Sequence, residues 1–283
     1  MKKLLSLLLV VALLLCTLCA CGTDNGETPN KDTGKSENVG SFDSDTKADE
    51  ALFEWEGNLI TAITSDGAKK ESILIPARCE GFYGVIFQGT NVKHVAFEDD
   101  DDVTLDFAFM GADQIVSVKL PNKLSVIPNM GFKGCESLEG ITFPADVVSL
   151  EGYAFKGCSS LKTVAFEGNK FSVIGENCFE DCAALKNITI PEGVTSIEKY
   201  AFSDCTALVD VELSTTVKKI AKFAFGNTGI KEIHFPADIQ FDVMDTSAFG
   251  MVTYEMNVYI VQGSWCDQNQ SEWNIGFKEI KYE

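Results

Sequence analysis

Apolar positions recur along this chain with a period of about 23 residues. The most regular of them is a phenylalanine that returns every 22 to 24 residues. Its positions are Phe87, Phe109, Phe132, Phe155, Phe179, Phe202, Phe225 and Phe249. A single-core globular fold does not require such a period, but a stack of equivalent coils does, because each coil buries the same side chain against its neighbour. The pattern therefore predicts a repeat solenoid.

Each repeat continues with apolar residues at +3, +6, +9, +11, +15 and +18 from the phenylalanine. The +9 and +11 residues alternate with polar ones, which predicts a β-strand. A proline at +12, such as Pro144 or Pro191, ends that strand because it cannot donate to a ladder. The +15 and +18 residues suit a short second strand or a tight turn. We therefore expect a β-rich, curved array of seven or eight rungs over residues 87–253, with a parallel sheet on one face.

Cysteines occupy the +3 position in four successive repeats. They are Cys135, Cys158, Cys182 and Cys205. Equivalent positions stack, so these thiols and the phenylalanines beside them are predicted to form a buried structural ladder of small apolar side chains. A zinc or redox role is the alternative, but zinc needs ligands that converge tetrahedrally, whereas a ladder runs in a line. The sequence alone does not decide whether neighbouring thiols form disulfides.

Four repeats share the motif Ala/Cys/Gly-Phe-x-x-Cys-x-x-Leu in register. This motif resembles the BspA-type leucine-rich-repeat family of bacterial surface proteins, over roughly residues 87–253. The flanks are similar to that family's caps, which implies an N-terminal capping hairpin at 51–86 and a C-terminal cap at 254–283. Thr90 and Ala112 depart from the motif in the first rungs. Because family members are adhesins and protein-binding surface molecules, the resemblance implies a non-enzymatic protein that binds protein or glycan.

The first residues have the features of an export signal. Lys2 and Lys3 precede an apolar run over residues 4–15, and small residues follow, which predicts a signal peptide at 1–20. Leu18-Cys19-Ala20-Cys21 resembles a lipobox, which implies that Cys21 is acylated; an ordinary signal peptide with a chance cysteine is the alternative. Residues 21–50 continue as a polar segment that is predicted to be a disordered tether. We expect an exported protein, lipid-anchored at the cell membrane or surface.

The formal net charge of −19 argues against nucleic acid as a partner and against peripheral binding to anionic lipid, so membrane contact is expected through the anchor only. The acidic run at 98–102 lacks the spacing of a calcium loop, and we favour a solvated loop. The two histidines, His94 and His234, lie about six rungs apart, or roughly 29 Å. They cannot share a catalytic or metal site. We therefore expect no enzyme activity, cofactor or metal.

The outward positions of the main strand, at +8 and +10 with one residue fewer in the first and last rungs, form the candidate binding face. Its residues are His94, Ser117, Lys119, Thr142, Thr163, Asn187, Thr189, Asp210, Glu212, Glu232 and His234. The middle is small and hydroxylated and the far end is acidic, and no aromatic side chain of the kind that anchors interfaces is expected there. The expected partner is a host or bacterial surface protein or glycan. The alternatives are an envelope scaffold without a specific ligand, or an accessory protein to a hydrolase.

Overall fold

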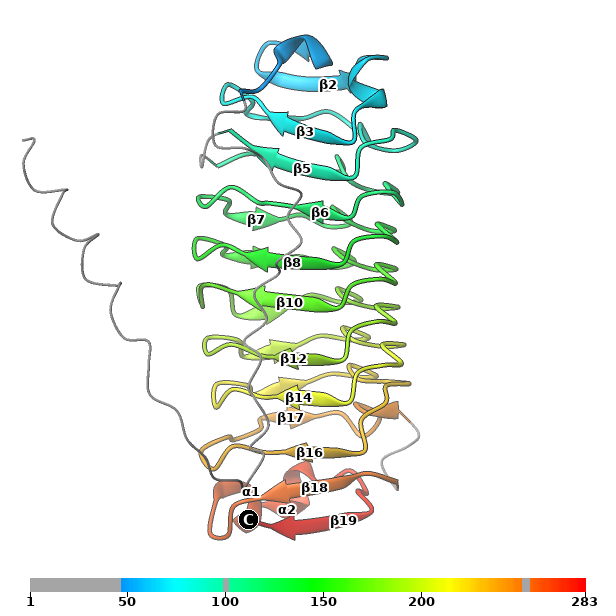
Figure 1. Cartoon of the computed structure of the whole chain (residues 1–283). Helices are drawn as coiled ribbons and strands as arrows, with labels where there is room; N and C mark the ends of the chain where they lie inside the picture. The colour runs from blue at the N-terminus through cyan, green and yellow to red at the C-terminus, as the bar shows by residue number, and fades with distance from the viewer. Residues whose placement is uncertain (1–46, 99–101, 251–254) are drawn as a thin grey trace, which may run out of the picture. The chain divides into compact units, whose positions relative to one another are not determined.

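The computed structural model describes residues 47–98, 102–250 and 255–283. These residues form a β-solenoid of about 9 turns (Figure 1). One strand of each turn contributes to a main stack of parallel strands. In order along the stack these strands are β3 (Ser72–Ile75), β5 (His94–Phe97), β6 (Ser117–Val118), β8 (Gly140–Phe143), β10 (Thr163–Phe166), β12 (Asn187–Thr189), β14 (Asp210–Glu212), β16 (Glu232–His234), β18 (Asn257–Ile260) and β19 (Glu279–Tyr282).

A second parallel sheet is built from the other segment of the repeat. Its strands are β7 (Val126–Ile127), β9 (Ser149–Leu150), β11 (Val173–Ile174), β13 (Ser196–Ile197), β15 (Lys219–Ile220) and β17 (Val243–Met244). The segment around +15 and +18 is therefore a short strand rather than only a turn. Its inward residue, at +18 in most rungs, is buried, as Leu150 and Ile174 show. The main stack is hydrogen-bonded in sheets of five, two and three strands, and it encloses the core together with this second sheet.

The ends of the stack differ from its middle. At the N-terminal end, short 3₁₀ turns at Glu50–Leu52 and Gly67–Lys69 flank an antiparallel hairpin of β1 (Phe53–Glu56) and β2 (Leu59–Ile63), and β2 also pairs with β4 (Gly81–Phe82). At the other end, α1 (Trp265–Gln268) and α2 (Gln270–Trp273) lie between β18 and β19. Trp273 is fully buried and packs edge-on against Phe235. These elements cover apolar surface that an open stack would expose.

The segment 87–253, where seven or eight rungs were expected, contributes seven strands to the main stack, from β5 to β16. Strand β18 continues the stack beyond this segment, and strands β3 and β19 are added at its two ends. They were missed because neither strand follows a phenylalanine at the usual offset, so the period that revealed the other rungs does not mark them.

The periodic phenylalanines are buried and stack on one another through the core. Neighbouring rings from Phe87 to Phe249 lie 4.7–5.4 Å apart between centroids, with planes tilted by at most 12°. This spacing is close to the separation of about 4.8 Å between paired strands, so one ring fits each rung. Full burial of each ring is worth about 1.5–3 kcal/mol. The phenylalanine ladder is thus the axis of the core.

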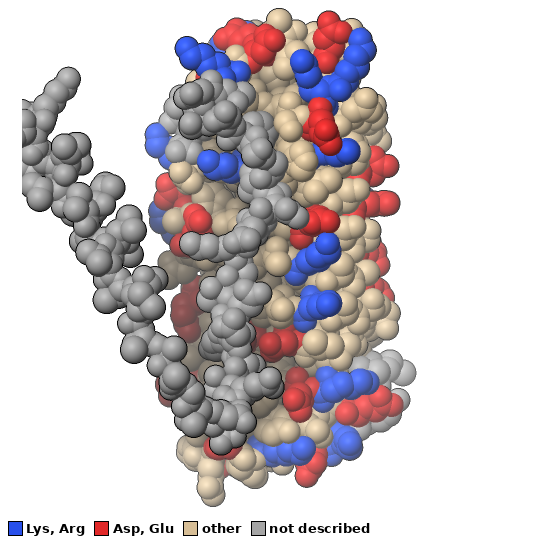
Figure 2. Space-filling model, viewed as in Figure 1, with Lys and Arg blue, Asp and Glu red and all other residues tan. Residues whose placement is uncertain are grey.

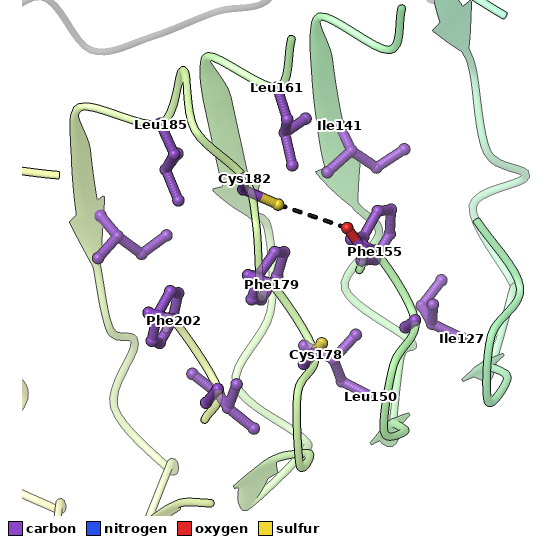
Figure 3. Packing of buried hydrophobic residues seen from close by; sticks show 14 of the residues in the cluster. Ile127, Ile141, Leu150, Phe155, Leu161, Cys178, Phe179, Cys182, Leu185 and Phe202 are labelled. Carbon is purple, nitrogen blue, oxygen red and sulfur yellow. Dashed lines mark hydrogen bonds between the residues drawn. The ribbon is translucent and has the colours of Figure 1, made fainter. Parts of the chain in front are cut away.

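The four +3 thiols are buried and free, and each donates a hydrogen bond across the stack. The acceptor is the phenylalanine carbonyl one rung away. Cys182 Sγ, for example, lies 3.4 Å from the Phe155 oxygen (Figure 3). The Phe132 oxygen accepts both from the backbone N–H of Cys135 at 3.1 Å and from Cys158 Sγ at 3.2 Å. The thiols therefore serve as donors inside the core as well as filling it.

Rungs without this cysteine supply another donor. Thr90 and Thr228 occupy the same position, and each hydroxyl donates to the phenylalanine carbonyl of its own rung, at 2.9 and 3.0 Å. In the rung of Ala112, the side chain of Gln114 reaches back and donates to the Phe87 oxygen at 2.8 Å. Because a buried carbonyl is costly to leave without partners, the departures from the cysteine pattern are compensated locally.

Candidate binding face

The outward face of the main stack consists of two columns of side chains set by the strand register. Asn187, Asp210, Glu232, Asn257 and Glu279 follow one another in the first column, and Thr189, Glu212, His234, Tyr259 and Lys281 follow one another in the second. The residues between the columns point inward and are buried, as in β14, where Val211 separates exposed Asp210 from exposed Glu212. Parallel pairing holds neighbouring members of a column about 4.8 Å apart.

The N-terminal half of the face offers less side-chain surface than predicted. Ser117 was expected to be exposed, but it is only 6% accessible, and its hydroxyl lies 2.8 Å from Nδ1 of His94. His94, Thr142 and Thr163 are half-buried, whereas Lys119 is exposed. Ser117 is therefore a partner of His94 rather than a free contact point.

The middle of the face is exposed and polar. Asn187, Thr189, Asp210 and Glu212 are all exposed on two adjacent rungs. The Thr189 hydroxyl donates to Oε2 of Glu212 at 3.0 Å. The acidic rung of Asp210 and Glu212 thus lies next to a rung of hydrogen-bonding, uncharged side chains.

A network of aromatic and charged side chains occupies the C-terminal rungs. The rings of His234 and Tyr259 stack with centroids 4.4 Å apart and planes 5° apart. Nδ1 of His234 lies 3.0 Å from Oε2 of Glu283. The Tyr259 hydroxyl donates to Oε2 of Glu232 at 3.4 Å and accepts from Lys281 Nζ at 3.3 Å. This bond to Tyr259 raises the pKa of the Lys281 ammonium above its ordinary value.

Tyr259, Lys281 and Glu283 were not among the predicted site residues. They fall in the segment expected to form the C-terminal cap, and the face was expected to lack aromatic anchors. The structure corrects this, because β18 and β19 continue the main stack and place Tyr259 beside His234. Tyr259 stands at +10 from Phe249, so extending the repeat by one strand would have found it.

The BspA-type leucine-rich-repeat region model matches residues 67–148 and 125–254, in 6 copies. The chain belongs to this family. Among solved structures, it is similar to a leucine-rich repeat protein from Bacteroides ovatus, with a TM-score of 0.57 and 20% identity over 79% of this chain and 64% of that chain. The chain thus spans about two thirds of that protein's length. No curated protein matches the chain in sequence.

Two further structures are less similar. A leucine-rich repeat protein of T. pallidum aligns at a TM-score of 0.43 with 20% identity, covering 64% of this chain and 89% of that one. A leucine rich cell surface protein of Faecalibacterium prausnitzii aligns at a TM-score of 0.36 with 17% identity. The alignment covers 85% of this chain and 96% of that one.

The two histidines of this BspA-type repeat protein lie far apart on the main stack. His94 and His234 lie on β5 and β16, with β6, β8, β10, β12 and β14 between them, so they share no site. Within the described ranges no group of three or more His, Cys, Asp or Glu side chains is placed to hold a metal ion. Carboxylates flanking the acidic run support neighbouring rungs instead: Glu98 accepts from the Ala77 N–H at 3.1 Å, and Asp102 accepts from the Ser125 hydroxyl at 2.8 Å.

Acidic and basic side chains are interspersed along the edge just before the main strands (Figure 2). The pairs Lys93–Glu71, Lys162–Glu139 and Lys231–Glu255 join adjacent rungs at 2.9, 3.1 and 3.7 Å. Exposed pairs of this kind contribute little to stability, on the order of 0–1 kcal/mol each. The charges of each pair offset one another across adjacent rungs.

Two predicted features lie outside the described residues: the lipobox with Cys21, and residues 99–101 of the acidic run. In the part of the chain that the structure describes, no helix has the length and apolarity needed to cross a bilayer.

Proposed function

We propose that this protein is a non-enzymatic cell-surface lipoprotein that binds a macromolecule, adhesin-like, through the outward face of its main stack. The observation that supports the proposal most is the cluster of Glu232, His234, Tyr259 and Lys281 beside the acidic rung of β14. An aromatic ring surrounded by charged hydrogen-bonding groups is the composition expected of an interface hot spot.

The scaffold favours multipoint binding. The strands of the C-terminal half of the face each pair in register with at least one neighbour, so little backbone order is lost on association. The exposed Asp210 and Glu212 favour a partner surface that presents cations or hydroxyl groups. A host or bacterial surface protein, or a glycan, fits these requirements.

The lipoprotein part of the proposal rests on the sequence Leu18-Cys19-Ala20-Cys21. Two acyl chains on Cys21 would give stable anchoring, which a single chain does not provide. Metabolic labelling with an alkynyl fatty acid should mark the wild-type protein, and Cys21→Ala should lose the label and be released from the membrane fraction. Equal labelling of Cys21→Ala would contradict lipidation at this residue.

A binding screen tests the proposed function. The full chain is passed over immobilised matrix proteins, mucins and bacterial surface glycans, and saturable binding to at least one is expected. The variant Asp210→Lys/Glu212→Lys should then bind at least tenfold more weakly. The control Glu136→Lys/Glu272→Lys changes two exposed carboxylates elsewhere and carries the same charge change, so its affinity should stay within about threefold.

Two outcomes would count against the proposal. Equal losses in both variants would mean that net charge, not the face, governs binding. An absence of binding to the whole panel, with a weakened cell envelope when the protein is deleted, would favour a structural scaffold, and turnover of any substrate would overturn the non-enzymatic assignment.

A further inference from the structure

A column of large side chains runs along the turn that precedes each ladder phenylalanine. We name it the edge column; its members are Phe107, Met130, Tyr153, Asn177, Tyr200 and Phe223. The last five have positive φ angles, between 53° and 61°. This conformation has a structural reason, because it directs each backbone N–H to a carbonyl on the next rung, as from Tyr153 to Glu176 at 2.8 Å.

The residue types in the edge column are not the ones this backbone conformation favours. Asparagine tolerates the left-handed region best after glycine, whereas bulky side chains are uncommon there. Asn177 shows that the fold accepts the favoured residue at this position. Phe107 is 45% exposed, Met130, Tyr153, Tyr200 and Phe223 are half-buried, and Asn177 is buried. Tyr, Phe and Met are the side chains enriched at the centres of protein interfaces.

Charges beside the edge column are distributed unevenly along the stack. Lys133 and Lys156 lie one residue after Phe132 and Phe155, in the N-terminal half of the column, and Lys156 forms an ion pair with Glu180 of the same chain. Asp181 and Asp204 lie at the corresponding turns of the C-terminal half. Burial and the nearby carboxylates of Glu180 and Asp204 raise the pKa of Asp181, which indicates negative charge that the fold only partly compensates.

A second opposite pair lies on the other flank of the column. Asp106 precedes Phe107, and Lys222 precedes Phe223, where its Nζ lies 5.4 Å from the centre of the Phe223 ring. On this flank too, the two ends of the edge column carry opposite charges. Here the N-terminal end is acidic and the C-terminal end basic, the reverse of the flank that carries Lys133 and Asp204.

We propose that the edge column binds a second copy of the chain in antiparallel orientation. The two-fold axis crosses the column between the rungs of Phe155 and Phe179 and lies in the plane of the interface. This rotation places Phe107 against Phe223 and Met130 against Tyr200 of the other copy, and it brings Tyr153 over the turn of Asn177, whose own side chain is buried. The interface is isologous, so each contact occurs twice.

The same rotation pairs opposite charges on both flanks. Lys133 meets the Asp204 region of the other copy, Lys156 meets the Asp181 region, and Asp106 meets Lys222. A parallel arrangement would instead bring Glu176 of one copy toward Glu180 of the other, and like charges disfavour it. Charge complementarity thus selects both the occupant and its direction.

Two effects limit the strength of this association. The net charge of −19 repels a second copy, although salt at 0.15 M screens exposed charges beyond about 8 Å. A single edge is also narrow, at the low end of interface sizes, below about 1,200 Å² in total. We therefore expect a reversible dimer with a dissociation constant on the order of micromolar to tens of micromolar.

Sedimentation equilibrium of the full chain at 0.15 M salt tests this inference. The wild type should shift from monomer to dimer as concentration rises. Lys133→Asp and Asp204→Lys should each weaken the dimer at least tenfold, because each creates a like-charge contact twice. The double variant Lys133→Asp/Asp204→Lys restores both contacts and should dimerise within about threefold of the wild type, with circular dichroism confirming that every variant is folded.

A wild type that stays monomeric at millimolar concentration would overturn the inference. So would single variants that dimerise like the wild type, or a folded double variant that fails to recover. The inference does not depend on the proposed function, because the measurement involves no partner macromolecule.

Discussion

The thiol of Cys182 donates a hydrogen bond to the carbonyl oxygen of Phe155 in the adjacent rung, at 3.4 Å. The same relationship joins Cys158 to Phe132 at 3.2 Å. Stacked rings and stacked thiols are therefore one connected structure, in which each rung supplies an acceptor and its neighbour a donor. This explains why the phenylalanine and the cysteine recur together in the sequence.

Removing one such thiol should destabilise the stack. Cys158→Ala deletes a fully buried sulfur and the donor to Phe132, and we expect a loss of about 1–3 kcal/mol. Urea denaturation monitored by circular dichroism measures it. Cys79 is only half-buried, and its thiol donates to nearby Gly81 within the same segment, so Cys79→Ala should cost less. An equal cost for both would contradict a special role for the cross-rung bond.

The buried thiols also predict a loss of stability at alkaline pH. Burial raises the pKa of Cys135, Cys158 and Cys182 well above the ordinary value of 9.0. Below about pH 9 the thiols are protonated in both the folded and the unfolded chain, so their full contribution to the free energy of unfolding is present. Above it they ionise only in the unfolded chain, so stability falls by up to about 1.4 kcal/mol per pH unit for each thiol.

Urea midpoints at pH 8, 9 and 10 check this dependence. The midpoint should change little from pH 8 to 9 and fall between 9 and 10. Cys182→Ala should show a shallower fall, since one ionising group is absent. A slope identical to that of the wild type would show that other groups cause the alkaline loss.

The ring ladder predicts a large difference between two phenylalanines two rungs apart in the stack. Phe155 is fully buried between the rings of Phe132 and Phe179, so Phe155→Ala should cost about 3–5 kcal/mol. Phe107 is 45% exposed, and Phe107→Ala should cost no more than about 0.5 kcal/mol. Thermal melting of both variants measures the difference, and comparable losses would mean that the ladder is not the principal core.

The sequence was sufficient to predict the solenoid because burial repeats with the rung. Each turn must present the same side chains to its neighbours, so the period appears directly as Phe132, Phe155 and Phe179 with their cysteines. The sequence could not distinguish a second strand from a tight turn, because two residues such as Ser149 and Leu150 are too few to show alternation. The terminal strands β3 and β19 were missed because they follow no ladder phenylalanine.

The candidate site was less predictable for a related reason. Outward positions follow from strand alternation, and Asp210, Glu212 and His234 are exposed on their strands as alternation predicts. Their partners depend on which segments continue the stack. Glu283 is distant from His234 in the sequence, and only the pairing of β18 with β19 brings them together.

Tyr259 is expected to be the strongest single contributor on the face. Its ring lies on His234 and its hydroxyl between Glu232 and Lys281, so Tyr259→Ala should weaken partner binding by about 2 kcal/mol or more, roughly 30-fold. Titration calorimetry with the partner found in the screen measures this change. Tyr282→Ala, which removes a ring that is 54% exposed on β19, should change affinity less than threefold. A larger loss of affinity for Tyr282→Ala than for Tyr259→Ala would contradict a binding site on this face.

Carboxylate footprinting with the bound partner tests the central claim most directly. Asp210, Glu212 and Glu232 should be labelled by carbodiimide and an amine in the free protein and protected at least fivefold in the complex. Exposed Glu136, Glu151 and Glu272 should be labelled equally in both states. Unchanged labelling of the first three residues, with protection elsewhere, would contradict the account of how this repeat protein binds.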